Sequence, residues 1–173
     1  SIAFLQSSIA SGSPDSPSPI GQWKIVEKQC WGEGFGGYWL GLDVFWGTYG
    51  IHGTLREDSI GRSVSHGCIR MRTQDVKELF DLVPVGTPVN IYSGPFGPFG
   101  TGFRKLKPGD RGADVLAVQQ RLKALGYFQG ATTGIYEDNL KQAIYRFQKD
   151  KGLKIKFTLT KPDYLAMGFA EQE

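Results

Sequence analysis

The spacing of hydrophobic side chains divides the 173-residue chain into a first part with the period of strands and a second part with the period of helices. Residues 23–27 alternate apolar and polar side chains, as a half-buried strand does. The aromatic-rich runs 38–45 and 48–52 are bounded by glycine, which also suits strands, and residues 89–92 predict a closing strand. The first part is therefore predicted to be built on a sheet.

One amphipathic helix is predicted within this first part. Thr73 lies near its start and Pro84 stops it, because proline cannot continue a helix. Its apolar stripe, spaced at i, i+3, i+4 and i+7, is Val76, Leu79, Phe80 and Val83. A sheet with one covering helix gives a mainly β, or α+β, domain.

The second part predicts three short helices. Gly126 and Gly152 end the first two, and the third begins near Pro162. The apolar stripes of these helices are Val115, Val118, Leu122 and Leu125, then Leu140, Ala143, Ile144 and Phe147, then Tyr164, Leu165 and Met167. Helices this short are unstable singly, so they are expected to pack together as a small three-helix domain.

A stretch rich in glycine and proline separates the two parts. Residues 94–103 read as a linker stiffened by proline, which places one domain at 1–93 and the other at 104–173. At 40% hydrophobic residues and 13% aromatics, the composition is that of a globular protein. The net charge of +3, without a basic run, gives no reason to expect nucleic acid. No apolar stretch reaches the roughly 18 residues of a membrane span, and no signal peptide is visible.

The chemistry is concentrated in residues 52–70. This stretch holds both histidines, His52 and His66, and one of the two cysteines, Cys68. A thiol attacks as thiolate, and a neighbouring imidazole is the usual means of forming it near neutral pH. A cysteine and a histidine that converge in the fold can therefore carry out acyl transfer, in which the imidazole first takes and then returns a proton.

Two other interpretations of these residues remain open. Cys68 can be an inert buried thiol, as free cysteine often is. A metal site is disfavoured because the stretch lacks paired-ligand spacing, so no metal is expected. Cys30 lies in a loop-like context and is interpreted as a free thiol with no role, since a disulfide between it and Cys68 would block the nucleophile.

The motif resembles that of the L,D-transpeptidase catalytic domain (the YkuD-type family). His52-Gly53, a spacer, and then Ser65-His66-Gly67-Cys68-Ile69-Arg70 are similar to the family's signature. Residues 18–23 resemble its Thr-Pro-x-Gly-x-Phe segment, and the resemblance covers about 1–93. It implies a β-sandwich catalytic domain. The family usually has a strand before the residues with which this sequence starts, so an N-terminal strand is expected to be missing here.

The resemblance implies a role for each motif residue. Cys68 is the expected nucleophile, His52 the general base, and the Gly53 carbonyl the group that orients the His52 ring. Backbone N–H groups of Gly67 and Cys68 are candidates for an oxyanion hole, and Ser65 supports the turn.

His66 and Arg70 keep two interpretations each. On an extended segment both would share a face with Cys68, so His66 would lie near the thiol and Arg70 would hold a substrate carboxylate. Otherwise His66 packs within the turn, and Arg70 forms a surface or structural ion pair.

The second part resembles the three-helix peptidoglycan-binding domain. The similarity rests on residues 106–112, 118–122, 125–127 and Phe147-Gln148, although Thr133-Gly134 and residues 155–159 depart from the usual pattern. No ligand residue can be assigned within it.

Together the resemblances imply an extracytoplasmic enzyme that forms 3→3 cross-links in peptidoglycan through a Cys68 thioester, with peptidoglycan as partner and no cofactor. The alternatives are an L,D-carboxypeptidase using the same site, or a wall-binding protein with an unused site.

Overall fold

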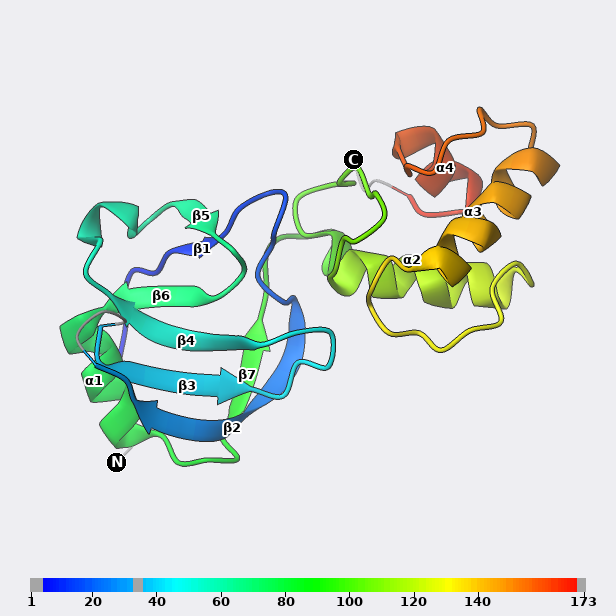
Figure 1. Ribbon diagram of the computed structural model, residues 1–173. Coiled ribbons are helices and arrows are strands. Elements are labelled where there is room, and N and C mark those ends of the chain that lie inside the picture. The colour runs from blue at the N-terminus through cyan, green and yellow to red at the C-terminus, as the bar shows by residue number, and fades with distance from the viewer. Residues whose placement is uncertain (1–4, 33–35, 171–173) are drawn as a thin grey trace. The chain divides into compact units, whose positions relative to one another are not determined.

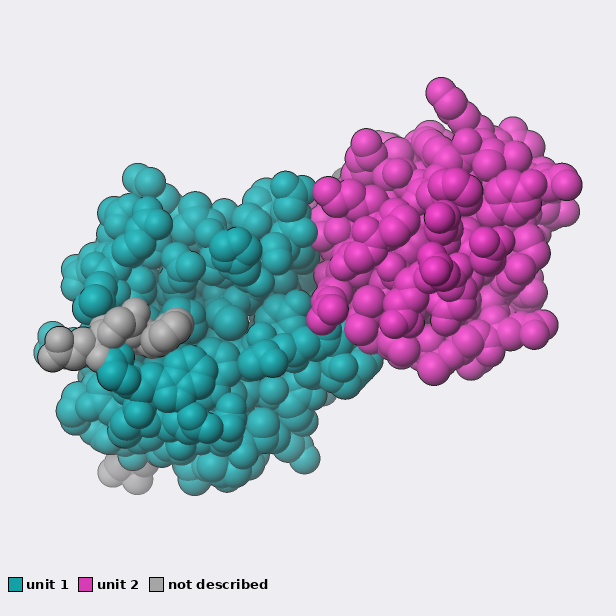
Figure 2. Space-filling model, in the orientation of Figure 1, with its two compact units in different colours: residues 1–91 teal, residues 92–173 magenta. Residues whose placement is uncertain are grey.

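The computed structural model describes residues 5–32 and 36–170, and the chain forms two compact units (Figure 1). The units are Ser1–Ile91 and Tyr92–Glu173, coloured separately in Figure 2. Each unit is described by itself below.

The first unit is built on a five-stranded sheet with the order β6-β4-β3-β2-β7. Only β4 and β6 run parallel, and the other neighbours are antiparallel. The strands of this sheet are β2 (Gly21–Cys30), β3 (Tyr38–Leu42), β4 (Tyr49–Thr54), β6 (Ile69–Arg72) and β7 (Pro88–Ile91).

The long strand β2 belongs to both halves of the sheet. Its first residues pair with β7, and its later residues, from Ile25 onward, pair with β3. The register shifts between Ile25 and Glu27, and such irregularities bend a strand and increase its twist. The sheet therefore curls around β2, as Figure 1 shows.

Helix α1 (Thr73–Leu82) covers one face of this sheet (Figure 1). The face carries the buried cross-strand row Leu40, Ile51 and Ile69. Lys28 continues the row on β2, and its ammonium donates to the carbonyls of Phe80 and Val83 at the end of α1. The predicted mainly β, α+β architecture is confirmed.

The N-terminal segment pairs through its backbone with the residues around the Ser65–Arg70 motif. A two-stranded parallel sheet joins β1 (Ser11–Gly12) to β5 (Ser63–Ser65), and Ala10 exchanges two backbone hydrogen bonds with Arg70. The short 3-10 helix η2 (Glu57–Ser59) lies in the connection between β4 and β5. Residues 1–4 lie outside the described part of the chain.

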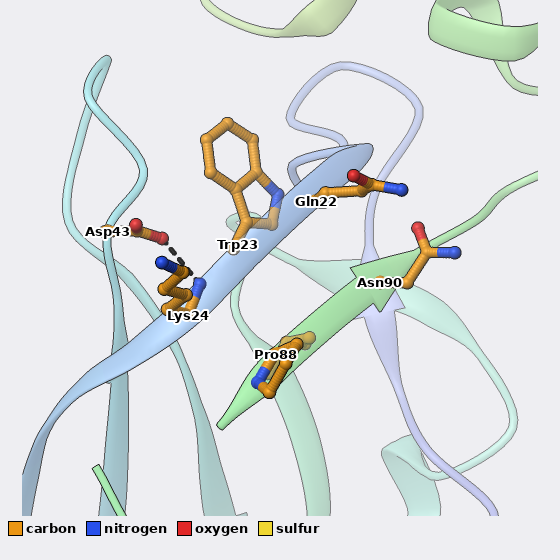
Figure 3. A pocket seen from close by; sticks show the side chains of 7 residues that line it. Gln22, Trp23, Lys24, Asp43, Pro88 and Asn90 are labelled. Carbon is orange, nitrogen blue, oxygen red and sulfur yellow. Dashed lines mark hydrogen bonds between the residues drawn. The ribbon is translucent and has the colours of Figure 1, made fainter. Parts of the chain in front are cut away.

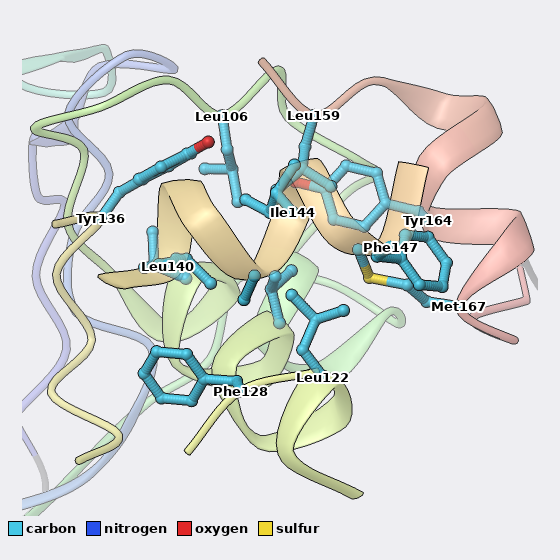
Figure 4. Close-up of a cluster of buried hydrophobic side chains, with 13 residues drawn as sticks. Leu106, Leu122, Phe128, Tyr136, Leu140, Ile144, Phe147, Leu159, Tyr164 and Met167 are labelled. Carbon is cyan, nitrogen blue, oxygen red and sulfur yellow. The ribbon is translucent and has the colours of Figure 1, made fainter. Parts of the chain in front are cut away.

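The second unit holds three helices around its own core (Figure 4). The helices are α2 (Ala113–Ala124), α3 (Asp138–Asp150) and α4 (Lys161–Ala166). The predicted stripes supply most of the core, but Leu125 and Leu165 are exposed. Leu125 is the residue that ends α2, so it lies beyond the helix face that packs inward.

Two buried glutamines tie the loops of this unit to its helices. Gln119 accepts from the Gly134 N–H at 2.8 Å and donates to the Ile135 carbonyl at 2.9 Å. Gln148 donates to Asp163 at 2.9 Å and accepts from the Lys156 N–H at 3.0 Å. Buried polar groups need such partners, so both side chains have a structural role.

The segment 94–103, predicted as a linker, has structure of its own. It contains the 3-10 helix η3 (Gly97–Phe99), and both Phe99 and Phe103 pack against the core of the second unit. The phenylalanine side chains account for the difference, because burial of each aromatic ring outweighs the turn tendency of the glycines and prolines around it.

Candidate active site

The parallel pairing of β4 with β6 brings the two halves of the motif together. His52 lies directly opposite Arg70 in this register, and Ile51 lies opposite Ile69. Continuing the register by one residue places Cys68 opposite Gly50, and the backbone of Gly50 forms a hydrogen bond with the thiol. Paired residues of neighbouring strands point to the same face. Cys68 and His52 therefore share the face of the sheet opposite α1.

This site face carries a continuous cross-strand row. Gln29 on β2 is opposite Trp39 on β3, Trp39 is opposite His52, and His52 is opposite Arg70. Tyr38, the neighbour of Trp39, points the other way and packs on Phe80 of α1. Tyr38 and Trp39 therefore occupy opposite faces of the sheet, as neighbours on a strand do.

His52 is held by its own backbone neighbourhood. Its Nδ1 lies 2.7 Å from the Gly53 carbonyl oxygen, which can only accept, so Nδ1 carries the proton. The predicted orienting contact is thus present, and it leaves Nε2 as the basic nitrogen. Burial lowers the pKa of His52 below its ordinary value of 6.5; the hydrogen bond to Gly53 opposes this shift and the charge of Arg70 adds to it. The ring is therefore neutral, and able to accept a proton, at pH 7.

The Cys68 thiol is free and partly buried. Burial raises its pKa above the ordinary value of 9.0, while the Gly50 hydrogen bond and the charge of Arg70 act in the opposite direction. The shifts of His52 and Cys68 both disfavour a resting ion pair. The motif predicts that His52 takes the proton of the thiol, and with the pKa values shifted in these directions we expect that transfer to accompany attack.

Ser65 closes the turn that presents the thiol. Its hydroxyl donates to the Cys68 carbonyl at 2.6 Å and accepts from the Gly67 N–H at 3.1 Å. Gly67 itself has φ +115°, and a Cβ there would lie 2.6 Å from the Tyr49 ring. Only glycine fits this position.

Two expectations about the turn need correction. The Gly67 N–H donates to Ser65, so its assignment to an oxyanion hole is wrong, and Cys68 N–H is the candidate that remains. The chain at residues 66–67 is a bend and not an extended segment, because Gly67 adopts a positive φ. The argument that placed His66 beside the thiol therefore fails. His66 is exposed, and its carbonyl accepts from Ser16 at 3.1 Å.

Two protein families match separate parts of the chain. Residues 3–91 match the family described as the L,D-transpeptidase catalytic domain, YkuD. The chain belongs to this family. Residues 111–155 match a family described as a putative peptidoglycan binding domain.

Relatives of this L,D-transpeptidase family member are bacterial proteins. The chain is 49% identical over 84 residues to the putative L,D-transpeptidase YkuD of Bacillus licheniformis, which covers 48% of this chain and 50% of the relative. It is 41% identical over 92 residues to the putative L,D-transpeptidase YqjB of Bacillus subtilis, covering 51% of this chain and 42% of the relative. The chain thus spans half or less of the length of these two curated relatives.

Solved structures include an Enterococcus faecium L,D-transpeptidase mutant, 30% identical to this chain. That comparison covers 51% of this chain and 41% of the other, with a TM-score of 0.45.

In this L,D-transpeptidase domain, the positive charge of Arg70 acts on two neighbouring groups. It lowers the pKa of His52 and that of Cys68. Arg70 forms an isolated antiparallel bridge with Ala10, and it is half-buried. Its predicted role in holding a substrate carboxylate stays a prediction.

Backbone packing explains why glycine follows His52. A Cβ on Gly53 would lie 2.5 Å from the Gly36 carbonyl oxygen, so the loop before β3 rests directly on this residue. The close approach leaves the Gly53 carbonyl fixed beside His52.

Trp39 and Glu27 are site residues that sequence reasoning did not single out. Trp39 belongs to the aromatic-rich run 38–45, and its place opposite His52 depends on a register that the sequence does not state. Cys30, predicted in a loop, is instead the last residue of β2 and pairs with Tyr38; it is an exposed free thiol.

A pocket of the same unit lies away from these residues. It is lined by parts of β2 and β7 together with Asp43, which accepts a hydrogen bond from the Lys24 N–H at 2.7 Å (Figure 3). None of the predicted site residues lines it. Within the described chain, no group of three or more histidine, cysteine or acidic residues could hold a metal ion, and no helix has the length and apolar character that a membrane crossing requires.

Proposed function

We propose that this chain is an extracytoplasmic L,D-transpeptidase that forms 3→3 cross-links between peptidoglycan stems through a Cys68 thioester. The observation that carries the proposal is the arrangement of Cys68 and His52 on one face of the β4–β6 pair, with Nε2 of His52 left as the base by the Gly53 hydrogen bond. Membership of the L,D-transpeptidase family supports it.

In the first half-reaction, His52 Nε2 takes the proton of the Cys68 thiol as the sulfur attacks the carbonyl of the third residue of a tetrapeptide stem. The Cys68 N–H stabilises the developing oxyanion. Collapse of the tetrahedral intermediate breaks the bond to the terminal D-Ala, whose amine receives the proton from the imidazolium. A thioester and free D-Ala result.

In the second half-reaction, a side-chain amine of another stem attacks the thioester. His52 Nε2 takes a proton from that amine, and the departing Cys68 sulfur is protonated again. Arg70 is proposed to hold a carboxylate of the peptide, since a guanidinium binds such groups through two parallel hydrogen bonds. His66 is exposed at the turn and is assigned no step in this scheme.

The second unit is proposed to hold the polymer on which the first unit acts. Its match to a peptidoglycan-binding family supports this division of work. Tethering a binding unit to a catalytic unit raises the local concentration of substrate without any new contact at the active site.

The test is intact-mass analysis after incubation with a disaccharide-tetrapeptide, using the parent chain, Cys68→Ala and Cys30→Ser. A covalent adduct and a cross-linked dimer that disappear only in Cys68→Ala are expected. Release of D-Ala without dimer would make the enzyme an L,D-carboxypeptidase. A folded protein that sediments with peptidoglycan and leaves the stem intact would overturn the enzyme proposal.

A further inference from the structure

The indole of Trp39 lies along the site face and not out from it. A Cβ placed on Gly41 would be 3.0 Å from Trp39 Nε1, and one placed on Gly50 would be 2.5 Å from Trp39 Cη2. The indole therefore crosses the two glycines, with its N–H over β3 and its far edge over β4. This side chain is 3% exposed.

The far edge of the indole reaches the corner where the reacting groups meet. Gly50 is the residue whose backbone forms a hydrogen bond with the Cys68 thiol, and it precedes His52 by two positions on β4. The rings of Trp39 and His52 are 6.1 Å apart, centroid to centroid, at 32°. One buried side chain thus lies beside His52 and over Gly50, the residue whose backbone forms a hydrogen bond with the Cys68 thiol.

Glu27 fixes the other end of this indole. Its Oε1 accepts the Trp39 Nε1–H at 2.8 Å, and its Oε2 accepts from the Gln29 side chain at 2.9 Å. Hydrogen bonds to a carboxylate are about twice as strong as those between neutral groups. Glu27 lies opposite Gly41, whose missing side chain leaves the space for this contact.

His52 needs a second constraint because its Gly53 hydrogen bond holds one nitrogen only. A single bond at Nδ1 leaves the imidazole free to tilt about that contact, whereas a fixed ring beside it limits the tilt. The indole also excludes water from the imidazole, and burial is the main cause of the lowered His52 pKa.

We propose that Glu27 is a positioning residue that acts through Trp39: the carboxylate anchors the indole, and the indole keeps the His52 ring directed at Cys68. The inference rests on the proposed Cys68–His52 pair. It assigns no contact with substrate to either Glu27 or Trp39.

The experiment measures the rate at which iodoacetamide alkylates Cys68, as a function of pH, by intact mass. All variants carry Cys30→Ser, because the exposed Cys30 thiol would otherwise react as well. The set is Glu27→Leu, which removes the acceptor; Glu27→Gln, which keeps one; Trp39→Phe, which removes the donor; and the double variant Glu27→Leu/Trp39→Phe. Glu78→Leu, on an exposed position of α1, is the matched control.

Glu27→Leu is expected to slow alkylation at pH 7 by about tenfold, since a catalytic group misplaced by about 1 Å can cost up to about a hundredfold. Glu27→Gln and Glu78→Leu are expected to stay within about twofold of the parent rate, which is the size of effect that a distant surface change of about 0.5 kcal/mol produces. In the Trp39→Phe background, Glu27→Leu is expected to add nothing, because the hydrogen bond that it removes is already absent.

A direct readout of His52 separates positioning from a general loss of structure. The chain has two histidines, so the imidazole protons can be followed by NMR titration. The charged group that acts on the pKa of His52 is Arg70 on β6, and Glu27 on β2 is linked to the ring through the indole; Arg70 and Cys68 are unchanged in every variant. In Glu27→Leu the pKa of His52 is expected to rise toward its ordinary value as water reaches the ring.

Two results would overturn the inference while leaving the proposed function intact. One is a Cys30→Ser parent whose alkylation depends on His52 and is unchanged by Glu27→Leu. The other is a loss in Glu27→Leu that is fully additive with Trp39→Phe, which would mean that Glu27 acts by another route. A parent in which alkylation is slow and indifferent to His52→Ala would refute the catalytic pair itself, and the inference with it.

Discussion

Glycines at the site are required because neighbouring groups occupy the space that a side chain would fill. At Gly50 the occupant is the Trp39 indole, at Gly53 it is the backbone of Gly36, and at Gly67 it is the Tyr49 ring. The three positions share a consequence: each lets a rigid group approach His52 or Cys68 closely. The close approach of neighbouring groups to these glycines therefore shapes the site as much as its reactive side chains do.

Gly50→Ala tests this view at the position closest to both reacting groups. The new methyl group would lie 2.5 Å from Trp39 Cη2, so the indole must move or the strand must shift. We expect a loss of about 1–3 kcal/mol in the free energy of unfolding, as overpacked cores show, together with slower alkylation of Cys68. Gly61→Ala is a control in open space, although its positive φ adds some strain. Unchanged reactivity in Gly50→Ala would mean that the indole does not border the pair.

The pH dependence of Cys68 alkylation follows from the two pKa shifts. His52 has a lowered pKa, so the neutral base is present at pH 7 and is lost only as the pH falls below 6.5. Cys68 has a raised pKa, so unassisted thiolate appears only above pH 9.0. As the pH increases, the rate of Cys68 alkylation should therefore rise up to a pH below 6.5, then stay level, and rise again above pH 9.0. In His52→Ala the lower step should vanish, with a fall at pH 7 of about a hundredfold, the usual contribution of a general base. A single rise near 9.0 in the parent would contradict this scheme.

Sequence alone predicts the candidate reactive residues but not the residues packed around them. Cys68 and His52 both belong to the motif, and Gly53 follows His52 directly along the chain. All three can therefore be identified from the sequence. Trp39 and Glu27 lie on other strands, and only the register of β2, β3 and β4 brings them to His52. The use of the Gly67 N–H by Ser65 depends on backbone angles in the turn, which residue types do not specify.

Among the elements, α1 sets the face on which the site forms. The helix covers the Leu40–Ile51–Ile69 row, which leaves the alternate residues of the same strands to face away from it. A one-residue slip in β4 would turn His52 toward the helix. The sequence predicted this helix and the alternating strands correctly. It could not predict the parallel pairing of β4 and β6, because the connection between them holds η2 and β5 in place of a long helix.

Lys28→Met tests how α1 is attached to the sheet. The Lys28 ammonium donates to the Phe80 carbonyl and, at 2.9 Å, to the Val83 carbonyl, and it lies 4.3 Å from the centre of the Phe80 ring. Methionine keeps the length of the side chain and removes the donor. We expect the free energy of unfolding of the first unit to fall by about 1–3 kcal/mol, the cost of leaving such groups unpaired. Urea unfolding checks the value, with the exposed Lys24→Met on the same strand as control. An equal loss in both variants would assign the effect to charge and not to the helix end.

For the whole molecule, the division into two units implies that stability and chemistry can be changed separately. Each unit has its own buried residues, and the second has a continuous core that includes Phe147, fully buried, in edge contact with Tyr127. A small domain has a free energy of unfolding of only about 0.05–0.15 kcal/mol per residue. One large core deletion is therefore enough to unfold it.

Phe147→Ala uses this difference in the full chain. Removal of a buried phenylalanine costs about 3–5 kcal/mol, so the melting transition of the second unit should fall sharply while that of the first unit stays in place. Alkylation of Cys68 should remain at the parent rate, and sedimentation with peptidoglycan should be lost at temperatures between the two transitions. Tyr145→Ala, at a partly exposed position of the same helix, should change neither. If Phe147→Ala slowed Cys68 as much as it weakened binding to the polymer, the units would be energetically coupled, and the second unit would have to be treated as part of the active site's support.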